Sequence, residues 1–397
     1  MGWTKKLMME IQDQGDWPEL YGKCICSRHY EDKYLKNLID KDATPGKCSY
    51  CGRTAPVRDM QKFAQDVTWK IHIHYNNADD EGLLLASSFY DDEKEVIPGF
   101  KRVGPYILPN DAEHFESALE MMEELGLISD NNELNEDIEE MFSTQLWVKK
   151  DFNIPDENIR LTDEWLKFAK EVTETRRFTF LAKPEFANLA IGKGTGYGDI
   201  LSKLSRIINE QHLCVTLKKG TKLYRSRAVE DIDADYGFKD LTSAPAKFAF
   251  PNRMSPAGIG VFYASFEEDV AKKECVGSDS HFVVGTFETM RDMIVIDLTK
   301  IPAPSFWMSG WQENLFLHRF HHEITKPLNE DDRNKLRYVP TQIFTEFLRY
   351  MFRTETGQNV DGMIYGSAKV KDERNVVLFR NNEQSKSYVD LVNVEKI

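Results

Sequence analysis

The sequence predicts an α+β protein built from three parts. Four of its six cysteines fall within the first 51 residues, which indicates a small metal-bound module over residues 1–57. Apolar residues then recur at spacings of three and four, which predicts a mostly helical region over residues 58–215. Short β-branched and aromatic runs separated by turns follow, and they predict a C-terminal α+β domain over residues 216–397.

The bulk composition bounds the class of protein. A chain of 397 residues can form two or three domains with at least one sizeable core. The net charge of −14 disfavours general binding of nucleic acids or anionic membranes, although a local basic pocket could still hold a small anion. No apolar run reaches the roughly 20 residues of a membrane span, and the N-terminus lacks the apolar core of a signal peptide. The sequence therefore predicts a cytoplasmic protein without a membrane partner.

The first segment carries a zinc-ligand pattern. Two residues separate Cys26 from His29, two separate Cys48 from Cys51, and eighteen lie between the pairs. Each close pair can chelate a tetrahedral zinc ion, and Gly52 suits the turn after the second pair. Because all four positions are filled by protein, the predicted zinc site is structural and has no open position for catalysis.

This segment has little apolar periodicity, so it could not hold its fold by a core alone and needs such a staple. Two alternatives remain open. Cys24 could replace His29 as the fourth ligand, although only His29 gives the same spacing in both pairs. Alternatively, the cysteines are free cytosolic thiols without a metal.

The middle region is predicted to be helical because its apolar residues lie three and four positions apart. The segments with this pattern are 112–128, 133–142, 162–172 and 197–211. The excess of Asp and Glu falls on what should be their solvated faces. Residues 68–75, TWKIHIHY, are compatible with either a strand or a helix.

Two patterns in and after the middle region suggest other functions. Residues 192–199, GKGTGYGD, lack the full spacing of a P-loop, so a linker or a helix start is the better interpretation. Arg206 and His212 fit the loose Arg-x4–6-His spacing of HEPN-type ribonucleases. In a chain with nine histidines and many arginines, about one such match is expected by accident, and the acidic composition disfavours RNA.

Two histidine groups could also ligate a metal. They are His72-x-His74 and the run His321-His322-Glu323. Neither has a partner at ligand spacing, so satisfied core or surface histidines are the better interpretation.

The C-terminal domain is predicted from short runs rich in β-branched and aromatic residues. These strand patterns occupy residues 221–227, 259–265, 281–289, 293–299, 362–367 and 374–379. Helical patterns over 267–274 and 338–352 lie between them. This order of elements predicts a mainly antiparallel or mixed sheet.

Five motifs of this domain follow one another in a characteristic order. They are LYRSR, then NRMSPAGIGVFYAS with a helix that ends AKKE, then YVPTQIFTEFLRY, DGMIYGS and RNVVLF. Together they resemble the RES family, which is named for an Arg, a Glu and a Ser. The fold of that family is similar to that of ADP-ribosyltransferases, and its members studied as toxins consume NAD. The first segment also looks like the zinc-bearing N-terminal domain of one subgroup, HEPN/RES.

Carried over by position, the resemblance implies five site residues. The family arginine falls on Arg225, the second arginine on Arg253, the strand tyrosine on Tyr263, the helix glutamate on Glu274 and the serine on Ser367.

The sequence departs from the family pattern in three places. Asn252 stands where the family usually has Gly, and Asn also tolerates the left-handed turn conformation. Ser255 stands where Asn is common, and YGSAK around Ser367 is looser than the usual Tyr-x-Ser-Ser. Tyr224, which precedes Arg225, is predicted to be a further NAD-binding residue.

The chemistry of these residue types fits NAD+. Arg225 and Arg253 can bind the pyrophosphate through bidentate hydrogen bonds. Tyr263 offers a ring beside the nicotinamide or the ribose. Glu274 can stabilise the positive charge that builds on the ribose as the nicotinamide–ribose bond breaks. Ser367 would hold the nicotinamide amide or orient the ribose.

The resemblance implies an NAD+ glycohydrolase or phosphorylase that depletes NAD, acting as a toxin of a toxin–antitoxin or defence system. Its substrate would be NAD+, its metal a structural Zn2+, and its partner an antitoxin or regulatory protein. Three alternatives remain. The same residues could serve an ADP-ribosyltransferase that modifies a macromolecule, the domain could be a non-catalytic nucleotide-binding interaction module, or Arg206 and His212 could serve a ribonuclease.

Overall fold

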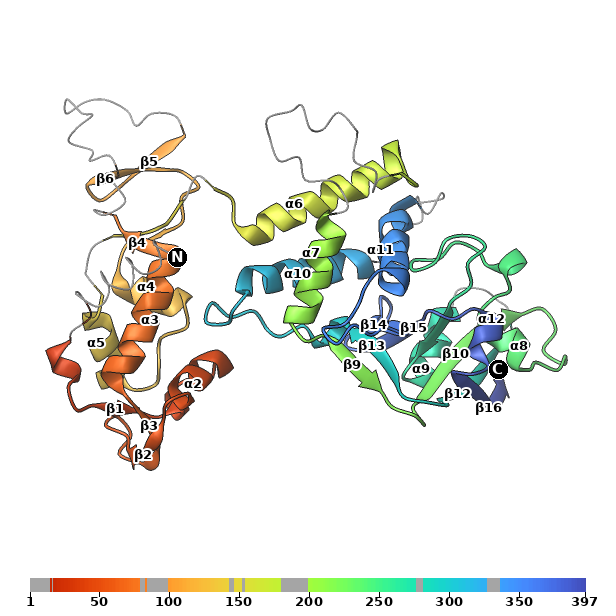
Figure 1. Ribbon diagram of the computed structural model, residues 1–397, viewed down its shortest axis with the longest axis horizontal. Helices are drawn as coiled ribbons and strands as arrows, with labels where there is room; N and C mark the ends of the chain where they lie inside the picture. The colour runs from red at the N-terminus through yellow and green to blue at the C-terminus, as the bar shows by residue number, and fades with distance from the viewer. Residues whose placement is uncertain are drawn as a thin grey trace. The chain divides into compact units, whose positions relative to one another are not determined.

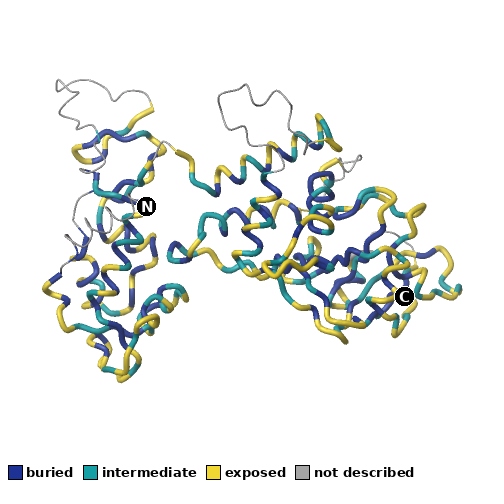
Figure 2. The backbone as a smooth tube through the Cα atoms, in the orientation of Figure 1, coloured by how far each residue is buried: buried dark blue, intermediate teal, exposed yellow. Residues whose placement is uncertain are grey.

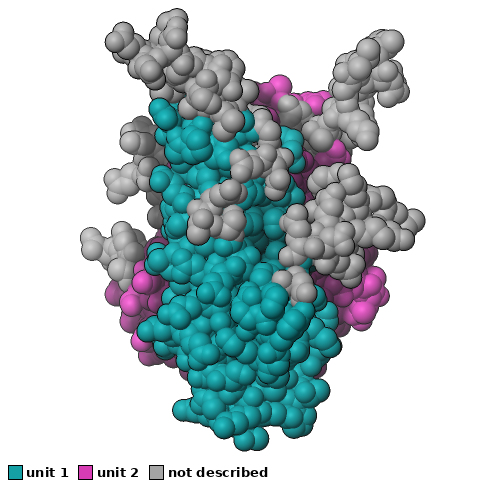
Figure 3. All heavy atoms as spheres, turned by 90° about the vertical axis from the view of Figure 1, so that its left-hand side faces the viewer, with its two compact units in different colours: residues 1–155, 304–311 teal, residues 156–303, 312–397 magenta. Residues whose placement is uncertain are grey.

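The protein divides into two compact units in the computed structural model (Figures 1 and 3). Unit 1 comprises residues 1–155 with 304–311, and unit 2 comprises residues 156–303 with 312–397. The structure describes the residues 15, 17–78, 83, 99–142, 146–151, 154–179, 199–275, 281–326 and 336–397, with the backbone alone for the last two residues of the helix that ends at Cys275. The domain boundaries predicted after residues 57 and 215 stay predictions.

Unit 1 mixes helices with short strands. Its elements are η1 (Pro18–Leu20), β1 (Cys24–Ile25), η2 (Ser27–His29), α2 (Lys33–Asp40), β2 (Thr44–Lys47), β3 (Thr54–Asp59), α3 (Met60–His74), β4 (Tyr75–Asn77), β5 (Phe100–Val103), β6 (Tyr106–Pro109), β7 (His114–Phe115), α4 (Ala118–Glu124), α5 (Asn132–Glu140) and β8 (Trp147–Lys149). The strands form sheets β1-β3-β2, β4-β8-β7 and β5-β6. None of the helices in the described part of the chain combines the length and apolar character that a membrane crossing needs.

Side-chain caps set where these helices begin. Asp32 accepts hydrogen bonds from the backbone N–H groups of the first turn of α2, and Asp59, Ser117 and Asn131 do the same for α3, α4 and α5. The ambiguous segment 68–75 is helical as far as His74. The predicted helix over 112–128 is shorter than its pattern, because its first part forms β7.

One hydrophobic core joins the segment that carries Cys24 to Cys51, here called the cysteine segment, to the helices that follow it. Cys26 and Cys48 are buried in the same cluster as residues of α3, α4 and α5. Tyr50 Oη donates to Asp137 Oδ2 at 2.7 Å, and Lys23 Nζ lies 2.6 Å from the same oxygen. The segment 304–311 adds Phe306 to this core. The cysteine segment therefore draws stability from a core larger than itself.

Unit 2 is built on one large sheet. Its elements are α6 (Glu157–Lys170), the π-helix η4 (Glu171–Thr175), α7 (Asp199–Glu210), β9 (Cys214–Leu217), β10 (Lys222–Val229), α8 (Phe238–Leu241), η6 (Ala246–Phe248), β11 (Phe262–Ser265), α9 (Glu268–Cys275), β12 (His281–Thr289), β13 (Met293–Asp297), η7 (Leu298–Lys300), α10 (Trp311–Thr325), η8 (Leu336–Tyr338), α11 (Val339–Tyr350), β14 (Gly362–Gly366), β15 (Arg374–Leu378), α12 (Asn382–Ser385) and β16 (Val389–Lys396).

The eight strands lie in the order β16-β12-β10-β11-β15-β14-β13-β9. Every pairing is antiparallel except that of β13 with β14, which is parallel, so the predicted mixed sheet is confirmed. All six strand patterns contain a strand, whereas β9 and β16 were not predicted. The α+β class is confirmed.

The two faces of the sheet belong to two cores. Helices α6, α7, α10 and α11 bury one face together with Met363 and Val377. The opposite face buries Phe262, Phe287 and Val376. Strands β14 and β15 are buried along almost their whole length, because both of their faces are covered (Figure 2).

Candidate active site and metal centre

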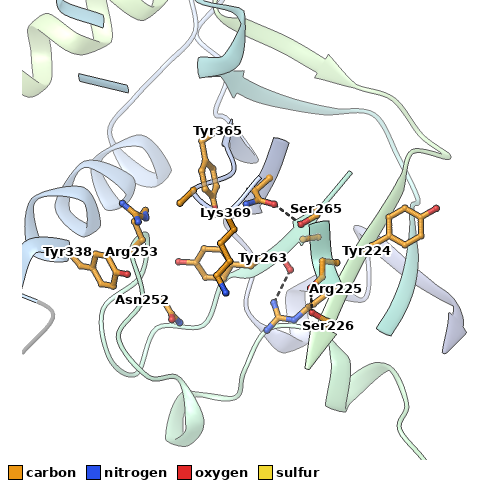
Figure 4. Close-up of a pocket in the computed structure, with 14 residues that line it drawn as sticks. Tyr224, Arg225, Ser226, Asn252, Arg253, Tyr263, Ser265, Tyr338, Tyr365 and Lys369 are labelled. Atoms are coloured by element: carbon orange, nitrogen blue, oxygen red, sulfur yellow. Dashed lines mark hydrogen bonds between the residues drawn. The ribbon is translucent and has the colours of Figure 1, made fainter. Parts of the chain in front are cut away.

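Unit 2 contains a cavity of about 580 Å³ at the middle of the sheet (Figure 4). Its walls come from β10, β11, β14, β15, helix α9 and the segment around Arg253, and Tyr338 closes one side. Of the predicted site residues, the cavity brings together Tyr224, Arg225, Arg253 and Tyr263. Tyr224 on β10 and Tyr263 on β11, 39 positions apart in sequence, meet at one place because the sheet pairs their strands.

The floor of the cavity is a row of side chains across four strands. In register, Tyr365 on β14 lies opposite Asn375 on β15, Asn375 lies opposite Ser265 on β11, and Ser265 lies opposite Tyr224 on β10. Directly opposed residues of antiparallel strands lie on the same face, and all four residues line the cavity. Sequence reasoning selected only Tyr224 from this row.

Arg225 lies where two strands part. Strands β10 and β11 share a single opposed pair, Tyr224 with Ser265. Beyond it, Arg225 Nη1 donates to the carbonyl oxygen of Tyr263 at 3.1 Å, and its guanidinium carbon lies 5.8 Å from the centre of the Phe262 ring. The side chain thus gives a carbonyl of β11 a hydrogen-bond donor, and this fixes the guanidinium at the cavity wall.

Arg253 is fixed by a helix end. Its Nη1 and Nη2 donate at 2.6 Å to the carbonyls of Ile324 and Lys326, where α10 ends. A cation is favoured there because the last carbonyls of a helix are unpaired and carry partial negative charge. The guanidinium also lies 5.3 Å from the centre of the Tyr338 ring, which is a cation–π distance.

The turn that carries Arg253 is held by α11. Asn252 and Ser255 exchange backbone hydrogen bonds across it. Gln342 Nε2 donates to the carbonyl of Asn252 at 2.7 Å, and Thr341 Oγ1 donates to that of Arg253 at 2.7 Å. Asn252 is not among the residues with positive φ, so the left-handed conformation that the sequence allowed is not adopted. These contacts give the YVPTQ motif a positioning role.

Tyr263 is a neutral phenol in this site. Its Oη accepts a hydrogen bond from the backbone N–H of Met254 at 2.9 Å. Burial raises the pKa of Tyr263 to about 12, against the opposing hydrogen bonds from Ser255 and Met254. The phenol therefore keeps its proton at neutral pH, and it can pack or hydrogen-bond but cannot serve as a phenolate base.

Glu274 lies on α9, which borders the cavity. Ala271, one turn earlier on this helix, lines the cavity, and residues three apart share a helix face. Ser226 Oγ donates to the carbonyl of Ala271 and so ties α9 to β10. The side chain of Glu274 lies outside the described residues, so its predicted catalytic role rests on this helix position.

Ser367 is not among the residues that line the cavity. It follows β14, and its Oγ accepts hydrogen bonds from the backbone N–H groups of Lys369 and Val370, both at 3.2 Å. The next residues, Ala368 and Lys369, do line the cavity, and Lys369 Nζ donates to the carbonyl of Lys273 on α9 at 3.1 Å. In this structure the Ser367 hydroxyl shapes the loop that carries Lys369.

The cavity has a strong charge bias. Among the described residues that line it, Arg225, Arg253 and Lys369 are cationic, and none carries a carboxylate. The whole chain has a net charge of −14, so this concentration of positive charge is local. Such a site favours an anion.

Other lining residues were missed by sequence reasoning. They are Ser226, Ser265, Tyr338, Tyr365, Lys369 and Asn375. All of them except Lys369 lie inside motifs that carry the RES resemblance, so the motifs located them without assigning them a role. For those that lie on strands, the strand register, which the sequence does not contain, is what selects them.

The cysteine segment forms a four-residue cluster. The ligand atoms of Cys26, His29, Cys48 and Cys51 all lie within 4.8 Å of one another, and this group could hold a metal ion. The Cys26 and Cys51 sulfurs are 3.7 Å apart. Zn–S bonds of about 2.3 Å separate two sulfurs of a tetrahedral site by about 3.8 Å, so the geometry fits.

The hairpin β2–β3 and the short η2 turn build this cluster. Cys48 and Cys51 lie in the turn between the strands, where Gly52 has the positive φ of 68° that the knuckle requires. On the neighbouring chain segment, Cys26 precedes η2 and His29 is the last residue of η2. Cys24 lies on β1 and is not part of the cluster, so the choice of His29 over Cys24 agrees with the geometry.

The remaining sequence candidates do not converge on a site among the described residues. Arg206 pairs with Glu210 at 2.9 Å on α7, while the exposed His212 lies beyond the helix, 3.6 Å from Glu355. The His74 ring packs 5.3 Å from that of Phe306. Residues 192–198 of the glycine-rich stretch lie outside the described residues.

His321 contacts the end of β14, the strand that carries Tyr365 of the cavity. Its Nε2 accepts a hydrogen bond from the backbone N–H of Gly366 at 3.3 Å, at the end of β14. Burial chiefly lowers the pKa of His321, with His318 and His322 adding to the effect and Asp297 opposing it. The run 321–323 thus contains a structural histidine, as the sequence interpretation favoured.

We expect the stability of unit 2 to fall as pH drops below about 6.5, the ordinary histidine pKa. Since the folded pKa of His321 is lowered, the unfolded state binds more protons, so stability is full above 6.5 and is lost below it. His321→Gln keeps an acceptor for Gly366 but does not titrate, so its melting temperature should change less between pH 7.5 and 5. His281→Gln, at an exposed position where β12 begins, should behave as wild type. Equal pH slopes for all three proteins would contradict this.

Two family models match this chain. The model described as HEPN/RES N-terminal domain 1 matches residues 41–186, and the model described as RES domain matches residues 222–393. No curated protein matches the chain. The second match contains every described residue that lines the cavity, and the first begins within the cysteine segment.

Proposed function

This chain belongs to the RES-domain family, in the group that joins a HEPN/RES N-terminal domain to a RES domain, and from that premise we propose that it is an NAD+ glycohydrolase or phosphorylase. One observation carries the proposal. In a chain with a net charge of −14, a cavity of about 580 Å³ in unit 2 is lined by three cations and several tyrosines. The resemblance to RES proteins that consume NAD supports the same substrate.

The cavity suits NAD+ in size and chemistry. Its volume of about 580 Å³ lies in the range of small-molecule sites, roughly 300–1,000 Å³. Arg225 and Arg253 lie on opposite sides of Tyr263 and Lys369 in Figure 4, so cationic groups can meet the pyrophosphate along its length. The tyrosines offer apolar faces to the bases and riboses.

The proposed reaction breaks the bond between ribose C1′ and the nicotinamide nitrogen. Nicotinamide leaves with the bonding electrons as a neutral molecule, so no general acid is needed. The ribose gains positive charge, which the Glu274 carboxylate would stabilise. A water molecule then forms the new bond to C1′ and releases a proton, or an inorganic phosphate takes its place. Tyr263 stays protonated and so takes no part as a base.

The decisive test is nicotinamide release from NAD+ by the purified chain, with and without inorganic phosphate. Release without phosphate that yields ADP-ribose supports hydrolysis, and a phosphate-dependent rate supports phosphorolysis. ADP-ribose recovered on added protein or nucleic acid would instead support a transferase. Tight NAD+ binding without any release would support a non-catalytic nucleotide-binding module.

Arg225→Ala should weaken NAD+ binding by about 2 kcal/mol, or roughly thirtyfold in Kd, because a charged hydrogen-bond partner of the pyrophosphate is lost. Arg227→Ala is the matched control. Arg227 lies two residues along β10, is exposed and donates to the carbonyl of Asp240 outside the cavity. Calorimetric titration of both variants checks this, and an unchanged Kd for Arg225→Ala would show that the arginine does not bind the dinucleotide.

We also propose that the chain acts as a toxin restrained by an antitoxin or regulatory protein, in the cytoplasm where NAD+ is available. The family resemblance supports this role. Expression of the wild-type chain should drain cellular NAD+, and co-expression of a protein that binds and restrains the chain should prevent the loss. Intact NAD+ levels after expression of active protein would argue against toxicity.

The metal proposed for the cysteine cluster is zinc. Three thiolates and one imidazole at tetrahedral spacing match the ligands of structural zinc sites, and they leave no position for a substrate. The ion would hold the turn between β2 and β3 against η2. Its role in this proposal is structural and separate from the chemistry of the RES domain.

A further inference from the structure

Two buried polar side chains lie side by side on the cavity floor. Ser265 is 4% exposed and Asn375 is 7% exposed, although both line the cavity. Ser265 Oγ donates to Asn375 Oδ1 at 2.6 Å, the contact drawn at Ser265 in Figure 4. The floor is therefore a polar surface set into a largely buried sheet.

The hydrogen bond fixes what Ser265 can offer a ligand. A hydroxyl has one hydrogen and two acceptor sites. The hydrogen is used on Asn375, so the oxygen that lines the cavity is left as an acceptor. A buried acceptor is stabilised by a donor, and leaving it without one costs free energy. The ligand group above Ser265 should therefore carry an N–H or O–H.

The position of α9 indicates which part of NAD+ lies on this floor. On the proposed function, the bond that breaks must lie close to Glu274, on the helix face that Ala271 shares. Ser226 Oγ donates to the carbonyl of Ala271, which ties that helix to β10, the neighbour of the strand that carries Ser265. The nicotinamide, which is attached at the bond that breaks, then lies over the floor, and the pyrophosphate extends toward the arginines.

We propose that Ser265 is a specificity-determining residue that accepts a hydrogen bond from the carboxamide N–H of nicotinamide, and that Asn375 is a positioning residue that orients its hydroxyl. This inference rests on the proposed function. It gives Ser265 the amide-binding role that the family resemblance implied for Ser367, whose hydroxyl accepts from its own loop.

A carboxylate in place of the carboxamide should be rejected. It has no N–H to give, and its negative charge would face the serine oxygen. The hydroxyl could turn to donate to it only by giving up its hydrogen bond to Asn375 Oδ1, which is costly at a buried site. Nicotinic acid adenine dinucleotide is the matching probe. Nicotinamide hypoxanthine dinucleotide, altered only at the adenine, probes the other end.

The experiment compares kcat/KM for the three dinucleotides. The wild type should cleave NAD+ roughly ten- to a hundredfold better than the nicotinic acid analogue, and should cleave the hypoxanthine analogue almost as well as NAD+. Ser265→Ala should lower kcat/KM for NAD+ and bring its ratio to that for the nicotinic acid analogue near one. Asn375→Ala should also lower the ratio of kcat/KM for NAD+ to that for the nicotinic acid analogue. It should do so mainly by raising the rate with the analogue, because the Ser265 hydroxyl, no longer bonded to Asn375, can donate to the carboxylate.

Ser243→Ala is the matched control. Ser243 is fully buried and its Oγ donates to the carbonyl of Arg380 at 2.7 Å, but it does not line the cavity. This variant should melt at a lower temperature without any change in the ratio. If Ser265→Ala does not fold, the wild-type ratio and Asn375→Ala decide.

The outcomes separate the two ideas. Cleavage of NAD+ and of the nicotinic acid analogue at equal rates, or an unchanged ratio in Ser265→Ala, would overturn this inference and leave the proposed function standing. Discrimination against the hypoxanthine analogue alone would also overturn it, because the floor would then hold the adenine. No cleavage of any dinucleotide by the wild type would overturn the proposed function, and this inference with it.

Discussion

Glu274→Gln is expected to lower NAD+ turnover by roughly a hundredfold or more while NAD+ binds with near wild-type affinity. The substitution keeps the size and hydrogen-bonding capacity of the side chain and removes only its charge. A charge that stabilises the ribose cation matters most in the transition state, so the loss should appear in kcat and not in Kd. Nicotinamide release gives kcat, and calorimetric titration gives Kd.

Glu267→Gln is the matched control. Glu267 immediately precedes α9, is exposed and does not line the cavity. Its turnover should equal that of the wild type, and its expression should drain cellular NAD+ where that of Glu274→Gln does not. If Glu274→Gln cleaved NAD+ at the wild-type rate, Glu274 would be an ordinary helix residue and the reaction would need another group.

Cys48→Ser is expected to reduce bound zinc from about one ion per chain to almost none and to destabilise unit 1. Binding of a structural zinc ion is worth roughly 10 kcal/mol or more in small zinc modules, which exceeds the stability that most domains possess. Cys48 is buried in the core shared with α3, α4 and α5, so loss of the ion should disturb more than the turn itself. Elemental analysis and melting of the purified chain measure the two effects.

Cys24→Ser is the control for the metal. Cys24 lies two residues before Cys26 but outside the cluster, so this variant should keep a full complement of zinc. Metal loss in Cys24→Ser together with retention in a His29→Asn variant would mean that Cys24 is the fourth ligand. If protein purified without chelator holds no metal and still folds, the cluster is not a structural metal site.

The cluster that could hold a metal ion was the part of the protein most readily predicted from sequence. Its four residues come from two close pairs, and each pair is fixed by a local turn of three or four residues. Only the choice between His29 and Cys24 needed the fold, because both lie within three residues of Cys26 and the direction of a side chain depends on the strand or turn that carries it.

Only some of the cavity residues could be predicted from the sequence. The order of motifs led to Arg225, Arg253 and Tyr263, and the structure places all three at one cavity. Ser367 followed from the same motifs, yet its hydroxyl turns into its own loop. The partners of Arg253 could not be foreseen, because the carbonyls of Ile324 and Lys326 lie more than 70 residues away and a backbone carbonyl has no sequence signature.

The sequence by itself determined what depends on near neighbours. Hydrophobic periodicity determined the α+β class, cysteine spacing located the cluster that could hold a metal ion, and the motifs determined the RES family. Only the tertiary structure decided that Ser265 and Asn375, 110 residues apart, form one polar floor. The reason is physical: an antiparallel pairing shifted by one residue would turn each side chain to the other face, and that register is set by the packing of the whole sheet between its two cores.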